Sequence, residues 1–112
     1  MKDVFVTVVG MNHYHGTEFI TEKHIGNLRV RLAKEPENEY DHEAIKVTLP
    51  GLGKIGYVAN SVSTVCEDCF SGGRLYDKIR DFAMAAVEYK LDAGTIVCRV
   101  ELPEDYELGF ER

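Results

Sequence analysis

The sequence is short of basic residues, has few cysteines and contains no long hydrophobic run. Its 13 lysines and arginines are outnumbered by 19 aspartates and glutamates, so the net charge is -6 at pH 7. That balance argues against broad, nonspecific attraction to a phosphate backbone, which needs a basic face. A small local site remains compatible with it. Contact with nucleic acid, if made, should be short, salt-sensitive and dependent on shape and stacking.

No stretch of the chain is long and apolar enough to span a bilayer, and residues 1–6 alternate like a strand instead of forming a signal peptide. We therefore expect a cytoplasmic protein. With 112 residues, 45% of them hydrophobic and 29% charged, the composition is that of a soluble globular protein. No repeat, linker or low-complexity segment interrupts it, so residues 1–112 are expected to form a single domain.

Three thiols cannot all pair within one chain, and a cytoplasmic protein is expected to keep them reduced. Cys66 and Cys69 have the spacing of metal ligands, but structural zinc needs four ligands and no second pair at that spacing exists. His13, His15 and His24 could in principle supply the other ligands. Apolar residues around them recur at helical spacing, which favours burial of both thiols on a helix. We expect no metal and no cofactor, with Cys66 and Cys69 as weak zinc candidates. Cys98 alternates with Ile96 and Val100 and is expected in the core.

Strand signals, in which β-branched residues alternate with polar ones, recur along the chain. They predict strands over residues 1–10, 28–34, 44–49, 54–58 and 95–102. A helix is expected from Asn60 or Ser61 to about Phe70, ended by Gly72 and Gly73.

Residues 75–91 fit both a helical and a strand pattern. The hairpin signal at residues 92–94 (D-A-G), followed by a clear strand, favours a strand from about residue 80. Residues 50–53 (P-G-L-G) predict a second hairpin turn, and the glycine in residues 54–58 indicates close approach of a backbone or ligand. The sequence thus predicts a mostly β fold with one or two helices: a small antiparallel β-barrel of about six strands, OB-like or SH3-like.

Residues 35–47 (E-P-E-N-E-Y-D-H-E-A-I-K-V) begin as a turn and end as a strand. Asn38 and Asp41 can each accept a hydrogen bond from a backbone amide two residues on. Tyr40 and Asp41 therefore place an aromatic ring and a carboxylate side by side where a loop meets a strand, a common place for binding groups.

Four landmarks follow one another: residues 9–16 (V-G-M-N-H-Y-H-G), 30–36 (V-R-L-A-K-E-P), 38–47 (N-E-Y-D-H-E-A-I-K-V) and 55–58 (I-G-Y-V). The series resembles the HIRAN family, which carries a paired-aromatic loop, an N-x-Y/H-D-x-N-A-I-x-V motif and I-G-Y-V in this order. The resemblance implies an OB-like fold that binds single-stranded DNA at its 3′-hydroxyl end. It also implies a role in DNA repair or replication-fork processing, and a helicase or nuclease as protein partner.

The resemblance assigns roles to individual residues. Asp41 stands where the family's aspartate accepts a hydrogen bond from the terminal 3′-hydroxyl, and Tyr40 would contact the end nucleotide. Tyr14 matches the second aromatic of the paired-aromatic loop, and His13 replaces the first, which stacks on a base. Tyr57 matches the position after the glycine of I-G-Y-V.

The chain departs from the family pattern at several positions. Asn12 stands where helicase-linked members carry an arginine, and Asn60 lies near a lysine position, so two positive charges are missing. Glu43 replaces the usual asparagine. Arg29 and Arg31 would steer the DNA backbone if their strand lines the groove.

The same residues have purely structural interpretations. Asp41 can serve as a turn cap, Tyr40 as packing at the barrel edge, and Arg29 with Arg31 as a solvated strand face. The alternative function is a protein–protein interaction β-barrel without nucleic-acid binding. A positive groove would favour DNA, and an apolar or acidic groove would favour a protein partner. No nucleophile with a base partner and no carboxylate cluster stands out, so we expect no enzyme.

Overall fold

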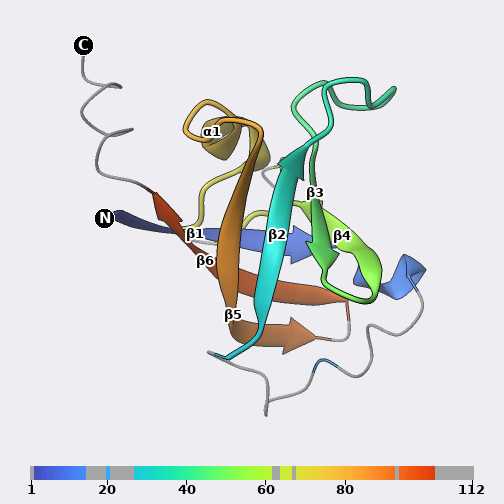
Figure 1. Cartoon of the computed structure of the whole chain (residues 1–112), viewed down its shortest axis with the longest axis vertical. Coiled ribbons are helices and arrows are strands. Elements are labelled where there is room, and N and C mark those ends of the chain that lie inside the picture. The colour runs from blue at the N-terminus through green and yellow to red at the C-terminus, as the bar shows by residue number, and fades with distance from the viewer. Residues whose placement is uncertain are drawn as a thin grey trace.

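The computed structural model describes residues 2–14, 20, 27–61, 64–66, 68–92 and 94–102. In that part of the chain six antiparallel strands form a closed barrel in the order β1-β4-β3-β2-β5-β6 (Figure 1). The elements are β1 (Lys2–Val9), the 3-10 helix η1 (Met11–His13), β2 (Arg29–Lys34), β3 (Ile45–Leu49), β4 (Gly53–Val58), α1 (Gly72–Tyr76), β5 (Phe82–Asp92) and β6 (Thr95–Leu102). The predicted β-barrel is confirmed. None of the helices described here is long and apolar enough to cross a membrane.

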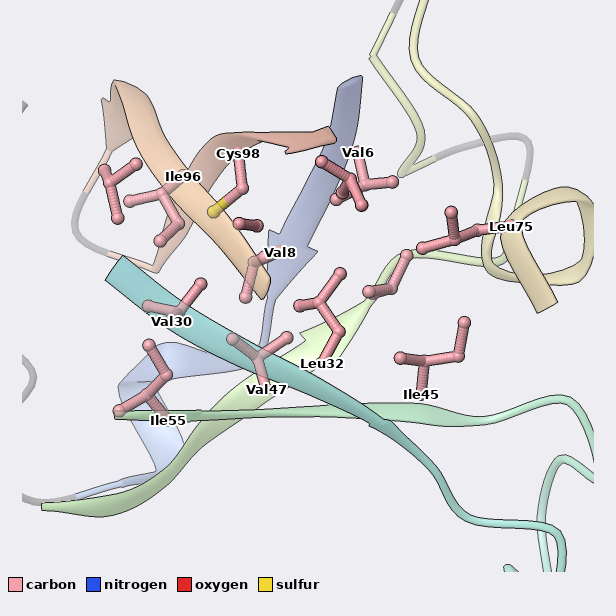
Figure 2. Packing of buried hydrophobic residues seen from close by; sticks show 14 of the residues in the cluster. Val6, Val8, Val30, Leu32, Ile45, Val47, Ile55, Leu75, Ile96 and Cys98 are labelled. Carbon is pink, nitrogen blue, oxygen red and sulfur yellow. The ribbon is translucent and has the colours of Figure 1, made fainter. Parts of the chain in front are cut away.

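The barrel interior is built from the period-two pattern that the sequence shows. On β2, Val30 and Leu32 are fully buried while Arg29 and Arg31 are exposed, and β3 buries every second residue. Figure 2 shows the inward side chains of several strands meeting in one cluster. Cys98 belongs to this cluster with no exposed surface, as predicted. Burial of these apolar side chains is the main force that stabilises the barrel.

The ambiguous segment is a strand from Phe82 onward, so the preferred interpretation is confirmed. β5 pairs with β2 along one edge and with β6 along the other. Its register with β6 shifts near Tyr89, which marks a bulge in this long strand. Pairing on both edges satisfies the backbone of β5, and this tertiary context overrides its equally good helical spacing.

The helix predicted between residues 60 and 70 is wrong. Val65 donates its backbone N–H to the Ser61 carbonyl, closing one turn, but the described residues that follow are not helical. The Cys66 amide instead donates to the Thr7 hydroxyl at 3.0 Å, and Asp68 has a left-handed φ of 66°. Both features interrupt the i→i−4 hydrogen bonds that a helix requires.

The helix begins where the sequence predicted an end. The Ser71 hydroxyl accepts from the Arg74 amide and caps α1, which starts at Gly72. A side chain at Gly73 would place its Cβ 2.7 Å from Glu43 Oε1, so the glycine permits close packing here instead of ending a helix. Leu75 is fully buried and reaches from α1 into the barrel core (Figure 2).

The connection between β4 and α1 completes the wall of the barrel. β1 and β4 share only the pairs Val8↔Val58 and Val9↔Tyr57 in their register. Beyond them, the Ala59 amide donates to the Thr7 carbonyl at 2.7 Å, and the Phe70 amide donates to the Phe5 carbonyl at 2.7 Å. Both ends of the connection are therefore held to β1.

Candidate nucleic-acid interface

An open cleft of about 640 Å³ lies between the β2–β3 loop and the start of the connection that follows β4. The β2–β3 loop and α1 lie at the same end of the barrel (Figure 1). The cleft brings together three of the motifs singled out from the sequence. Its lining residues are Val9, Asn38, Tyr40, Asp41, Ala44, Tyr57, Val58, Ala59, Asn60, Ser61 and Thr64.

Asn38 shapes the β2–β3 loop at the cleft. Its Oδ1 accepts from the backbone amides of Tyr40 at 2.8 Å and Asp41 at 3.1 Å, as its turn chemistry predicted. Its Nδ2 donates to Glu35 Oε1 at 2.9 Å. The loop held in this way leaves the Tyr40 side chain 94% exposed, so a flat aromatic face stands beside the cleft.

Asp41 is fixed by one hydrogen bond to each carboxylate oxygen. Oδ1 accepts from the Glu43 amide at 2.9 Å, which is the predicted turn cap, and Oδ2 accepts from Asn60 Nδ2 at 3.0 Å. Asn60 Oδ1 in turn accepts from the Gly73 amide at 2.7 Å. Each carboxylate oxygen can accept more than one bond, so capping leaves Asp41 able to accept from a ligand.

The hydroxyl of Tyr57 is held by hydrogen bonds with two charged neighbours. Its hydroxyl donates to Glu35 Oε1 at 2.8 Å and accepts from Lys54 Nζ at 2.7 Å. Lys54 also forms an ion pair with Glu35 Oε2 at 3.3 Å. Burial raises the pKa of Tyr57, so the phenol stays protonated and keeps donating to the carboxylate. Glu35 thus holds both Tyr57 and, through Asn38, the loop that carries Tyr40 and Asp41.

Acid should weaken this arrangement through Glu35. Burial alone would raise the pKa of Glu35, but hydrogen bonds from Asn38, Tyr57 and Lys54 outweigh it and hold the pKa below its ordinary value of 4.5. A carboxyl with a lowered pKa stabilises the fold fully above its unfolded-state pKa and loses that contribution as pH falls through its folded-state pKa. We expect Glu35→Gln to lower the free energy of unfolding by about 1–3 kcal/mol at neutral pH and by less under acid conditions.

Urea unfolding of both proteins at neutral pH and below pH 4.5 measures this difference. The exposed neighbour Glu37 supplies the control, since Glu37→Gln should change stability little at either pH. A Glu35→Gln effect of equal size at both pH values would contradict the prediction.

The glycine of the I-G-Y-V motif lies against β1, as its position in a strand indicated. A Cβ built on Gly56 would lie 2.5 Å from the Val9 carbonyl oxygen and 3.4 Å from Met11 Cγ. The close approach is therefore made by backbone, with Met11 of η1 packed beside it. This contact sets the position of β4 next to Val9 and places Tyr57, the following residue, at the cleft.

Asn12, His13 and Tyr14 of the paired-aromatic loop are not among the residues that line the cleft. Asn12 and His13 belong to η1 and are exposed, and Tyr14, which directly follows η1, is half-buried. Gly10 connects η1 to Val9, which lines the cleft. The Asn12 side chain lies against Gly94, where an added Cβ would meet Asn12 Nδ2 at 2.8 Å. His15 and Gly16 of this motif lie outside the described residues.

Arg29 and Arg31 also lie away from the cleft. Both are on the outer face of β2, between β3 and β5. Arg29 forms an ion pair with Glu101 at 3.4 Å, and the Arg31 guanidinium lies 4.5 Å from the Phe82 ring centroid. Their arrangement matches the interpretation as a solvated strand face, and neither arginine nor lysine occurs among the described residues that line the cleft.

Sequence reasoning missed the supporting residues Glu35 and Lys54, and the cleft residues Ser61 and Thr64. Glu35 lies next to Pro36 in a stretch that was recognised, but no local pattern reveals that it binds Tyr57, 22 positions away. Among the described residues no group of three or more histidine, cysteine, aspartate or glutamate side chains could hold a metal ion.

The model of the HIRAN domain family matches residues 1–73. The chain belongs to the HIRAN domain family. Among solved structures it is similar to the crystal structure of the HIRAN domain of human HLTF, with a TM-score of 0.60 and 20% sequence identity. The similarity covers 95% of this chain and 81% of that one. No curated protein matches the chain.

At 20% identity, the similarity to that structure shows that the two proteins share a fold and nothing more. It extends the comparison to β5 and β6, which close the barrel beyond the residues that the HIRAN family model matches. Family membership supports a DNA-binding module instead of a catalytic one.

Proposed function

We propose that this HIRAN domain captures the 3′-hydroxyl end of single-stranded DNA in the cleft beside Tyr40 and Asp41. The observation that carries the proposal is the pairing of an almost fully exposed aromatic ring with a fixed carboxylate at one open cleft. In this proposal Tyr40 stacks on the terminal base and Asp41 accepts the hydrogen bond of the terminal hydroxyl. Tyr57 and Asn60 form the opposite side of the site.

The chemistry of Tyr40 and Asp41 suits recognition of a DNA 3′ end of any base sequence. An ionised carboxylate is a hydrogen-bond acceptor only, so it attracts a hydroxyl and repels a terminal phosphate. An aromatic face stacks on any base and contributes roughly 1–3 kcal/mol per base. Because the described residues that line the cleft include no lysine or arginine, stacking and the hydroxyl bond carry more of the affinity in this proposal than phosphate contacts.

Fluorescence anisotropy with short oligonucleotides that end in 3′-hydroxyl or 3′-phosphate tests the function at low salt. We expect tighter binding of the hydroxyl end, and we expect Tyr40→Ala to weaken that binding roughly 5- to 100-fold through loss of stacking. Tyr89→Ala supplies the matched control, since Tyr89 is also exposed but lies on β5 and does not line the cleft. Equal affinity for the two ends would contradict end recognition.

One observation favours the second candidate, a groove for a protein partner. Among the described residues that line the cleft, Asp41 is the only charged one, so this part of the groove lacks the positive character that the DNA interpretation anticipated. An exposed tyrosine beside apolar walls also suits an extended peptide. Failure of both oligonucleotides to bind at low salt would overturn the DNA proposal and favour the peptide groove.

A further inference from the structure

A second hollow, of about 320 Å³, lies on the outer wall of the barrel, and its described lining residues are all different from those of the cleft. Its described lining residues come from β1, β5, β6 and the connection that follows β4. Tyr89 and Leu91 leave more than half of their side-chain surface exposed there. The lining residues are Phe5, Cys66, Asp68, Cys69, Tyr89, Leu91 and Val97.

Cys66 and Cys69 both line this hollow, and a backbone hydrogen bond joins them. The Cys69 amide donates to the Cys66 carbonyl at 3.0 Å, and Asp68 has a φ of 66°, as the third residue of some turn types requires. Such a turn brings the Cα atoms of its first and fourth residues within about 7 Å. Disulfides span Cα separations of roughly 4.4–6.8 Å, a range that a turn of this kind permits.

The turn is anchored on both sides. The Cys66 amide donates to the buried Thr7 hydroxyl, and the Phe70 amide, one residue after Cys69, donates to the Phe5 carbonyl. These bonds fix both cysteines against β1, so the chain loses little further conformational entropy when a disulfide forms between them. Both thiols are free and half-buried, which leaves them accessible to a small reagent from the hollow.

Zinc does not fit the site as described. A structural zinc ion takes four ligands, and the described residues offer no third histidine, cysteine, aspartate or glutamate in a group with these two thiols. A neutral disulfide needs no further ligand and suits surroundings that include Phe5, Tyr89 and Leu91.

We propose that Cys66 and Cys69 are a redox pair that a low-molecular-weight disulfide, such as oxidised glutathione, converts to an intramolecular disulfide. The thiolate of one cysteine attacks a glutathione sulfur, forming a mixed disulfide and releasing one glutathione thiolate. The other cysteine's thiolate attacks the protein sulfur of the mixed disulfide, forming the Cys66–Cys69 bond and releasing the second glutathione. Two electrons pass from the protein to glutathione, and the two thiol protons end on the released glutathione thiols.

Cys98 provides an internal control. It is fully buried in the barrel core, and burial, with a smaller contribution from Glu88, raises its pKa to about 12. A thiol in this state reacts slowly because the thiolate is the nucleophile. Cys98 should therefore remain a thiol under conditions that oxidise the other two.

The test equilibrates the full chain with mixtures of reduced and oxidised glutathione, then quenches with acid, alkylates the denatured protein and measures its intact mass. We expect two of the three alkylation sites to disappear together in the oxidising mixtures and to return on reduction. Peptide mapping should assign the bond to Cys66 and Cys69, and Cys66→Ser or Cys69→Ser should abolish it.

Three results would overturn the proposal. Full alkylation of all thiols in the most oxidising mixture would show that the pair does not close. Disulfides that join separate molecules, or that consume Cys98, would show that the turn does not select its partner. Copurified metal that protects both thiols from alkylation would assign the turn to metal binding instead.

Discussion

Replacing Asp41 by asparagine is expected to erase the preference for a 3′-hydroxyl over a 3′-phosphate and to weaken binding of the hydroxyl end roughly 10- to 100-fold. The carboxylate provides a charge-assisted acceptor for the hydroxyl and repels a terminal phosphate, whereas a neutral amide does neither. Hydrogen bonds to charged groups contribute about 1.5–3 kcal/mol, which corresponds to that range of affinity. This variant should therefore lose selectivity as well as strength.

The substitution keeps the turn closed because the asparagine oxygen can still accept from the Glu43 amide, although the bond that Asn60 Nδ2 donates to Oδ2 is lost. Glu39→Gln supplies the matched loss of charge, since Glu39 is exposed in the same loop but does not line the cleft. Anisotropy with both oligonucleotides, together with thermal unfolding of each variant, gives the result. Retention of the hydroxyl preference by Asp41→Asn would remove Asp41 from the recognition mechanism.

Much of the barrel could be predicted because its strands follow a simple alternation. The pattern of Val30 and Leu32 against Arg29 and Arg31 reports one buried face and one exposed face without any knowledge of the partner strands. The failure at residues 60–70 has the opposite cause. Its apolar spacing looked helical, but the Cys66 amide finds its partner in the Thr7 hydroxyl, 59 positions earlier. No local pattern contains a contact of that kind.

The candidate site divides in the same way. Tyr40 and Asp41 could be found because turn residues and strand residues meet within one short stretch, and the structure places both at the cleft. Tyr57 and Asn60 also line it. The positions of Arg29 and the η1 residues depend on which face of the closed barrel each strand presents, and barrel closure is a property of all six strands together.

Gly56→Ala should be the most destabilising single-methyl change near the site. The added Cβ would lie 2.5 Å from the Val9 carbonyl oxygen and 3.1 Å from Val8 Cγ1, and the first of these is backbone that cannot rotate away. Removing a glycine from a strand normally stabilises by roughly 0.5–1 kcal/mol because the unfolded chain loses freedom. The clash should outweigh this gain, since overpacking a buried site costs about 1–3 kcal/mol, occasionally more.

We therefore expect a net loss of about 1–2 kcal/mol in the free energy of unfolding, measured by urea denaturation. Gly72→Ala is the matched control, because its added Cβ would meet neighbours no nearer than 3.4 Å and should change stability much less. β1 and β4 share two residue pairs in their register, the fewest of any neighbouring strands in the barrel. Separating Val9 from Gly56 should therefore weaken the pairing that is already shortest. The same separation moves Tyr57 away from Glu35, so DNA binding should fall together with stability. A Gly56→Ala protein as stable as the wild type would show that β1 and β4 can move apart here without loss, and that the contact of Gly56 with Val9 does not set the position of Tyr57.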